Sequence, residues 1–325
     1  MDFNENSFDI FLLEEQVIKD AKTIMHDFKK KDNPLYKNYK KLVKAYEKLL
    51  NDSKKIVKLS DSLQKQLSNA SEEIRQQEIL KKHDMQAAQR IQSKLIPERR
   101  PDFNGFSIAS EYIPMNEVGG DFFDYILIDK YKTGFFIGDV SGHGVSASLV
   151  TTLIKSAIDN EKEFLANPAD LLNSLQKKLL PMLDEKFFTA FYGVFNEKDM
   201  TFTYSCAGHL DQLLIKTGTD EVEKLFLKGP VIGFFDYPGF NYSETRLKVE
   251  KDDLIVLFTD GLTELFCGPK SYETQYGQNG IIKTIISNKN VKIEELVDLI
   301  INDAREHQID KEFKDDVALI IIKIK

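Results

Sequence analysis

Hydrophobic residues recur at steps of three and four along residues 10–28, which is the spacing of an amphipathic helix. This helix is predicted to end near Asp32-Asn33-Pro34, because proline does not continue a helix. After Pro34 a heptad pattern begins, and neither glycine nor proline interrupts it from Leu35 to Ile96. The second segment therefore predicts one long helix of roughly 90 Å at 1.5 Å per residue.

The heptad pattern gives the long helix an apolar seam of the coiled-coil type. One seam position carries Leu42, Leu49, Ile56, Leu63 and Ala70, and the other carries Tyr46, Ser53, Ser60, Leu67 and Ile74. A monomer would expose this long apolar stripe to water, which is unfavourable. We therefore expect a homodimer that is paired through the N-terminal arm.

The seam fails just before the globular part of the chain, where the register turns Gln77, Lys81 and Asp84 inward. Two interpretations stay open. In the first, a phase shift lets neighbouring apolar residues such as Ile79 and Leu80 take over the stripe. In the second, the polar residues make a weakly packed segment with two available packings, through which regulation enters.

From residue 106 onward the pattern changes to short apolar and aromatic runs bounded by turn residues, which is typical of strands. The predicted strands cover residues 106–113, 122–128, 135–140, 188–195, 201–206, 213–216, 254–258 and 317–324, and the predicted helices cover residues 145–160, 168–183, 280–287 and 293–307. This grouping indicates an α+β fold of two stacked antiparallel β-sheets flanked by helices, an αββα sandwich. We expect a helical and coiled-coil arm over residues 1–86 and a globular domain over residues 87–325.

Composition narrows the class of protein. The chain has 325 residues and 42% hydrophobic content, enough for a substantial core, and its 44 basic and 52 acidic residues give a net charge of −8. This balance argues against nucleic acid as a partner. Cys206 and Cys267 lack partners at ligand spacing, so neither a disulfide framework nor a zinc site is predicted. Without an export signal or a long apolar run, we expect a cytoplasmic protein with no membrane insertion.

Two aspartates stand at the ends of a predicted hairpin, residues 119–144. Asp121 follows Gly119-Gly120 and Asp139 follows Gly138, so the backbone can approach closely whatever the carboxylates hold. Converging carboxylates repel each other, and a hard divalent cation is the usual remedy. For either aspartate alone, a turn residue that caps backbone amides is the favoured interpretation, so the metal hypothesis depends on matching carboxylates downstream.

Further carboxylates follow the same placement. Asp260 comes directly after the apolar run 254–258, and Lys314-Asp315-Asp316 immediately precedes the last predicted strand. The sequence therefore predicts four strand-end carboxylate sites that could serve one cation cluster.

An ordered set of motifs extends from about Ala87 to the C-terminus: VGGDFFD, GDVSGHG, CAGH, FTDGLTE and KDDVALI. Together they resemble the metal-dependent PPM (protein phosphatase 2C-like) serine/threonine phosphatases of the bacterial RsbU and SpoIIE branch. The stacked-sheet fold of that family agrees with the strand pattern above.

The resemblance implies a cluster of two Mn²⁺ or Mg²⁺ ions. By position, Asp139 matches the aspartate that bridges both metals, and the Val140 carbonyl matches an adjacent ligand. Asp121 matches the carboxylate on the second metal, and Asp260 with Asp315 completes the shell of the first. In such a centre a shared water of lowered pKa attacks the phosphate in line.

The resemblance leaves several neighbouring residues with secondary roles. Asp316 matches a support residue that could exchange roles with Asp315. His143 is a candidate general acid, which we discount because members of this branch can carry lysine there and a loop histidine can serve only to shape the turn. His209 is expected to be structural, and Asp124 and Glu264 to lie outside the metal shells. No arginine occurs between residues 100 and 246, so the phosphate clamp stays unassigned, and the start of the helix predicted at residue 145 could bind the anion instead.

The leading functional prediction is a phosphatase, regulated through its coiled coil, that acts on phosphoserine or phosphothreonine. RsbU-like enzymes imply a STAS-domain anti-sigma factor antagonist as the substrate. The alternative is a noncatalytic adaptor that binds a phosphoprotein while the arm dimerises, which the complete set of carboxylates argues against. A third hypothesis, structural calcium, leaves the open loop at residues 141–144 unexplained.

Overall fold

The computed structural model describes residues 11–27, 34–97, 105–236, 238–269, 274–308 and 311–325. The chain divides into two compact units, Met1–Lys82 and His83–Lys325, which are described separately below. Among the described segments, no helix combines the length and apolarity needed to span a bilayer.

The first unit consists of helix α1 (Leu12–Asp27) and most of helix α2 (Pro34–Gln92), which continues into the second unit. Both helices were predicted from the apolar spacing, and α2 begins at the predicted proline. Val43 and Leu50 are buried, and an ion pair between Lys54 and Glu15 joins α2 to α1. The predicted seam residues, in contrast, are exposed in this single chain. Helix α1 still borders the first turns of the seam, because Val17, Ile18 and Ala21 line one cavity together with Leu42, Tyr46 and Leu49.

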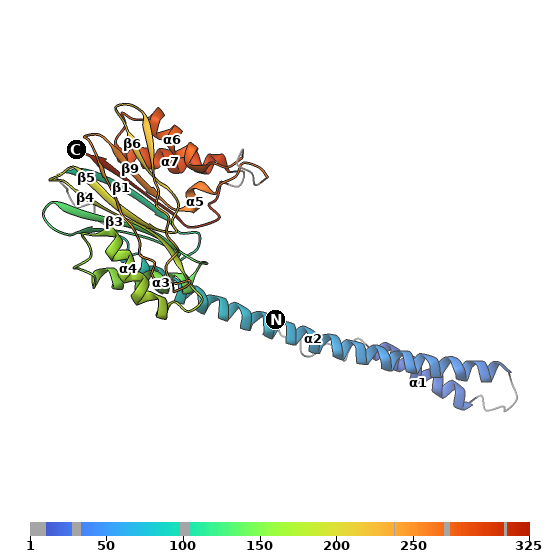
Figure 1. The fold of residues 1–325 in the computed structure, drawn as a ribbon. Coiled ribbons are helices and arrows are strands. Elements are labelled where there is room, and N and C mark those ends of the chain that lie inside the picture. The colour runs from blue at the N-terminus through green and yellow to red at the C-terminus, as the bar shows by residue number, and fades with distance from the viewer. Residues whose placement is uncertain (1–10, 28–33, 98–104, 237, 270–273, 309–310) are drawn as a thin grey trace. The chain divides into compact units, whose positions relative to one another are not determined.

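The second unit contains two five-stranded antiparallel sheets (Figure 1). The first has the order β1 (Phe106–Ile113), β10 (Val317–Ile324), β9 (Leu254–Phe258), β6 (Gln212–Lys216) and β7 (Glu221–Leu225). The second has the order β2 (Asp121–Leu127), β3 (Lys132–Val140), β4 (Phe188–Asn196), β5 (Thr201–Ala207) and β8 (Thr245–Lys248). Strands β7 and β8 escaped prediction because they are short, largely charged edge strands without an apolar run.

Helices cover the outer face of each sheet. Helices α3 (Val145–Asp159) and α4 (Pro168–Leu179) share a core with β2, β3 and β4, whereas α6 (Gly277–Ser287) and α7 (Ile293–His307) share one with β9 and β10. The short helix α5 (Asp260–Thr263) follows β9. The predicted helix 168–183 ends early, at Leu179, and a 3-10 turn follows (Leu180–Met182), because Pro181 has no backbone N–H for an α-helical bond. The predicted αββα sandwich is confirmed.

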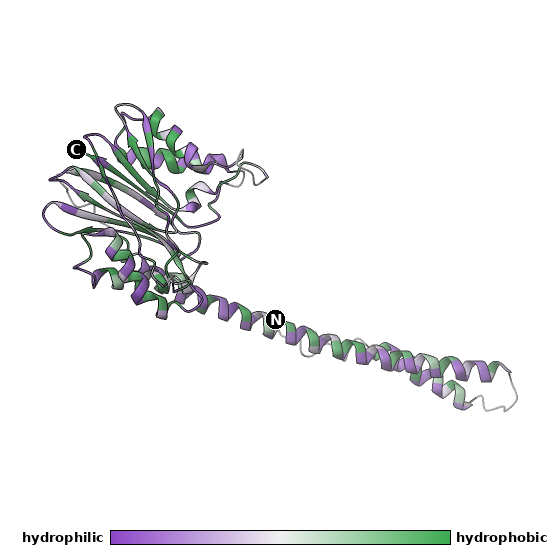
Figure 2. Cartoon of the chain, in the orientation of Figure 1, coloured by the Kyte–Doolittle hydropathy of each residue, from purple (hydrophilic) through white to green (hydrophobic). Residues whose placement is uncertain are grey.

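Successive side chains of each strand point to opposite faces of its sheet, so one set packs between the two sheets. Phe122 and Phe136 pack toward the helices, while Phe123 and Phe135 pack between the sheets with residues of the opposite sheet such as Ile320. In Figure 2 the strands carry hydrophobic stretches interspersed with paler and hydrophilic ones, and α2 alternates between hydrophilic and hydrophobic residues. The two sheets thus form one rigid support on which strand ends are fixed.

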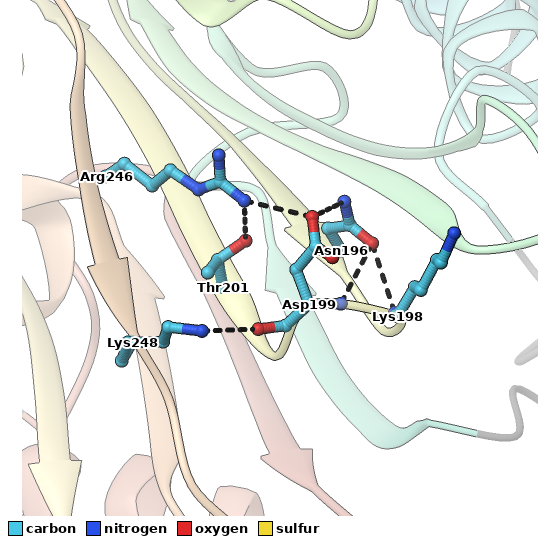
Figure 3. A network of polar contacts seen from close by, with 6 residues as sticks. All are labelled: Asn196, Lys198, Asp199, Thr201, Arg246 and Lys248. Carbon is cyan, nitrogen blue, oxygen red and sulfur yellow. Dashed lines mark hydrogen bonds and ion pairs between the residues drawn. The ribbon is translucent and has the colours of Figure 1, made fainter.

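A polar network fastens the β4–β5 turn to edge strand β8 (Figure 3). Arg246 donates to the Asp199 carboxylate at 3.0 Å and to the Thr201 hydroxyl at 3.2 Å, and Lys248 donates to the Asp199 carbonyl at 3.0 Å. This turn follows Asn196, the last residue of β4, while Thr189, beside Asp139, lies at the start of that strand. Arg246 therefore forms its hydrogen bonds at the end of β4 that is farther from the aspartates.

Candidate active site

The second sheet brings Asp121 and Asp139 together. Asp121 is the first residue of β2, and its register partner on β3 is Asp139, which also pairs with Thr189 on β4. Burial, followed by the negative charge of Asp139, holds the pKa of Asp121 well above its usual range. The hairpin predicted from the sequence thus places both carboxylates side by side at its open end.

The first sheet contributes the other two predicted carboxylates. Asp260 opens α5 directly after β9, and Asp315 stands two residues before β10, the neighbour of β9. Burial, and then the charges of Asp260 and Asp315, raise the pKa of Asp139 to about 7. Aspartates from both sheets therefore repel one another across the end of the sandwich.

This donor set fits a hard divalent cation, because it consists of carboxylate oxygens whose mutual repulsion a positive charge would relieve. The buried Tyr112 hydroxyl lies near Asp316 and Asp121 and has no hydrogen-bond partner among the described residues, as expected beside a hydrated ion. Among all the residues that the structure describes, no three His, Cys, Asp or Glu side chains are grouped closely enough to form a ligand set for one ion. The aspartates also differ in exposure, because Asp315 is exposed whereas Asp121 is buried.

Gly120 permits a close approach of the two loops that flank the aspartates. A side chain at this position would place its Cβ 2.8 Å from the Val140 carbonyl oxygen and 3.1 Å from that of Gly142. Only glycine fits there without displacing the Val140 carbonyl, the backbone ligand that the family resemblance implies.

Asp316 supports this loop through the backbone. Its carboxylate accepts hydrogen bonds from the amide of Met115 at 2.7 Å and from that of Gly120 at 2.5 Å. The side chain is buried, whereas that of Asp315 is exposed. The adjacent aspartates thus differ in environment, with Asp316 engaged by amides next to Asp121.

Two residues that the sequence analysis did not single out contact this machinery. The Thr259 hydroxyl donates to Asp121 at 2.6 Å and accepts from the amide of Ala318 at 2.9 Å, which ties Asp121 to the opposite sheet. The Gln92 side chain donates to the carbonyl of Gly119 at 2.6 Å and accepts from its amide at 3.0 Å. No local pattern reveals either role, because both partners are distant in sequence.

The remaining candidates have distinct settings. His143 is exposed in the turn between β3 and α3. His209 is buried and bonded to the Thr189 hydroxyl at 2.7 Å and the Phe258 carbonyl at 3.3 Å, and burial lowers its pKa to about 4. Asp124 is buried in an ion pair with Lys155 of α3 at 2.7 Å, whereas Glu264 is exposed.

Two antiparallel sheets packed between helices, with aspartates from both sheets converging at one end, define the PPM class of phosphatase. A family model described as stage II sporulation protein E (SpoIIE) matches residues 129–325. The chain belongs to this family, the RsbU and SpoIIE branch of the PPM phosphatases, and is a protein serine/threonine phosphatase. The resemblance stated from the motifs is confirmed.

Individual relatives agree with the family assignment. Phosphoserine phosphatase RsbU of Bacillus subtilis is 28% identical over 251 residues, which cover 77% of this chain and 72% of RsbU. The solved PP2C domain of SiaA from Pseudomonas aeruginosa superposes with a TM-score of 0.64 at 19% identity, over 75% of this chain and 96% of that domain. RsbX, solved in complex with magnesium, superposes with a TM-score of 0.51 at 17% identity, over 70% of this chain and 99% of RsbX. The last two likenesses establish the fold.

Proposed function

We propose that this phosphatase removes phosphate from a phosphoserine or phosphothreonine of a STAS-domain anti-sigma factor antagonist, within a partner-switching pathway. The observation that carries the catalytic part is the convergence of Asp121, Asp139, Asp260 and Asp315 from both sheets at one end of the sandwich. The relationship to RsbU, named a phosphoserine phosphatase, supports the substrate class.

We further propose that two Mn²⁺ or Mg²⁺ ions bind here, with Asp139 between them. Asp121 and the Val140 carbonyl would hold one ion, and Asp260 with Asp315 the other. Magnesium in the RsbX structure supports this choice of cation. When bound, such ions lower the pKa of water and neutralise phosphate charge.

The chain's own groups position the phosphate. Helix α3 begins after Gly144, and its first amides have no partners within the helix, so its N-terminus favours an anion. Lys186 donates to the Ser141 carbonyl at 2.8 Å and so places a cation against the loop between β3 and α3. These groups serve in place of an arginine clamp.

The arm is proposed to pair two chains and to transmit a signal. Residues 1–86 would form the regulatory part and residues 87–325 the phosphatase domain. Leu42, Leu49 and Ile56 are 66%, 63% and 67% exposed in one chain, which supports burial against a second copy. Helix α2 ends at Gln92, whose side chain is hydrogen-bonded to Gly119, so a change in the arm can reach the loop before Asp121 through the helix and these two hydrogen bonds.

Phosphate release from purified phospho-STAS proteins tests the proposal. We expect release with Mn²⁺, none with chelator, and none from the Asp139→Asn variant. Release from a small aryl phosphate but from no phospho-STAS protein would refute the substrate class alone. Binding of phospho-STAS protein without any release, at every Mn²⁺ concentration, would instead favour the noncatalytic adaptor.

A further inference from the structure

Three phenylalanines lie next to the loop between β3 and α3: Phe187, Phe234 and Phe235, called here the aromatic patch. The rings of Phe187 and Phe234 meet edge to face at 5.2 Å, and those of Phe234 and Phe235 at 4.3 Å. Phe234 is 52% and Phe235 is 57% exposed. Clustered exposed aromatic rings are characteristic of interaction surfaces.

The backbone that presents these rings is fixed. Gly233 donates to the Gln176 side chain at 3.0 Å, and the same side chain donates to the Phe235 carbonyl at 2.7 Å. Ile232 and Phe188 exchange two backbone hydrogen bonds of 2.9 Å. The patch is therefore held against α4 and β4, so its rings would lose little freedom on binding a partner.

The strand register connects the patch to the reaction site. The β3–β4 ladder pairs Asp139 with Thr189, and it extends outward because Ser141 donates to the Phe187 carbonyl at 2.9 Å and Phe187 donates to the Ser141 hydroxyl at 3.1 Å. Phe187 directly precedes β4 and lies two residues from Thr189, the register partner of Asp139. At the rise of an extended chain, two residues correspond to about 7 Å.

We propose that the aromatic patch binds apolar side chains of the protein substrate close to its phosphorylated residue. This inference rests on the proposed phosphatase site, because the patch continues outward from Asp139. An extended substrate advances at the same rise per residue as the strand, so its second residue from the phosphoserine reaches Phe187. Residues farther along meet Phe234 and Phe235. The patch thus selects substrates by the apolar residues that flank the phosphate.

The test uses the full chain with Mn²⁺ and three probes. The first is p-nitrophenyl phosphate. The other two are phosphoserine peptides that differ only at the second and third positions before and after the phosphoserine, where one carries leucine and the other serine. Wild type is expected to favour the leucine peptide by about tenfold in kcat/KM. The double variant Phe234→Ser/Phe235→Ser should lose this preference through KM, while p-nitrophenyl phosphate turnover is unchanged. Phe226→Ser, which alters an exposed phenylalanine beside β7 of the other sheet, is the control and should retain the preference.

The outcomes separate the two proposals. A wild-type protein that hydrolyses none of the probes refutes the phosphatase site. Hydrolysis without a leucine preference, or a preference that survives in the double variant, refutes the patch. Loss of p-nitrophenyl phosphate turnover in the folded double variant shows that the rings support the loop. A change in the mass of the protein in solution shows that the rings contact a second copy. Either result overturns the proposal. If the double variant does not fold, the single Phe235→Ser change, at the more exposed ring, must lower the preference about threefold.

Discussion

The side chain of Gln92 and the backbone of Gly119 exchange two hydrogen bonds, of 2.6 and 3.0 Å, across 27 residues of sequence. The same side chain donates to the Thr151 hydroxyl of α3 at 3.3 Å. Gln92 is the last residue of α2, and Gly119 stands two residues before Asp121. One buried amide thus joins the end of the arm helix to the loop before Asp121 and to α3.

Replacing Gln92 should weaken the site without unfolding the domain. Gln92→Ala leaves the carbonyl and amide of Gly119 without partners, at a cost of about 1–3 kcal/mol. We expect a higher Mn²⁺ concentration for half-maximal phosphate release and a lower kcat. Gln89→Ala, one turn earlier and exposed, is the matched control. Equal Mn²⁺ dependence in both variants and wild type would contradict a positioning role.

Asp139→Asn should abolish activity while the fold persists, because it removes the charge proposed to lie between both ions. Activity is expected to fall by at least about a thousandfold, a loss of roughly 4 kcal/mol of transition-state stabilisation. Asp121→Asn should weaken the binding of mainly one ion, and Asp315→Asn should weaken the binding of the other. Mn²⁺ titration calorimetry and phosphate release measure both effects, and unchanged turnover of Asp139→Asn at saturating Mn²⁺ would remove Asp139 from the centre.

His143→Ala is expected to retain a substantial part of the activity. The side chain is exposed, and solvent can protonate the leaving group. The decisive measurement is the pH profile of kcat. A drop of several orders of magnitude with loss of the acid limb would identify His143 as the general acid.

Folding stability should fall below about pH 6.5 through His209. Burial lowers the pKa of this residue in the folded protein to about 4 from 6.5, so the unfolded chain binds the proton first and gains stability as pH decreases toward 4. Between about pH 7 and about pH 5 this contributes a loss of roughly 2 kcal/mol. Urea unfolding of wild type and His209→Gln at both pH values isolates the effect, since the aspartates titrate in both proteins. Identical pH slopes would show that His209 is not buried neutral.

The arm should make the protein a dimer, and its polar seam positions should be where regulation enters. Changing Gln77, Lys81 and Asp84 to Leu, Ile and Leu is expected to lock one packing and shift phosphate release strongly up or down. Sedimentation gives the mass, and a chain that starts at Ala87 should be monomeric. A monomeric full-length protein, or a triple variant with wild-type activity and signal response, would leave the arm as a spacer.

The sequence by itself determined the elements whose pattern is local. The three-to-four spacing defined α1 and α2, the apolar runs defined eight of the strands, and motif order identified the phosphatase family. It failed for β7 and β8, whose charged edge positions carry no alternation strong enough to stand out, and for the end of α4 at Leu179. These elements depend on neighbours that local patterns do not encode.

Tertiary structure alone decided how the strand ends meet. Asp315 and Asp316 are adjacent and chemically identical, yet only Asp316 turns its carboxylate to the amides of Met115 and Gly120, because β10 lies beside β1 and β9. Thr259 reaches Asp121 across the two sheets, over 138 residues of sequence. Contacts between distant segments are set by sheet packing and loop closure, and no periodicity along the chain records them.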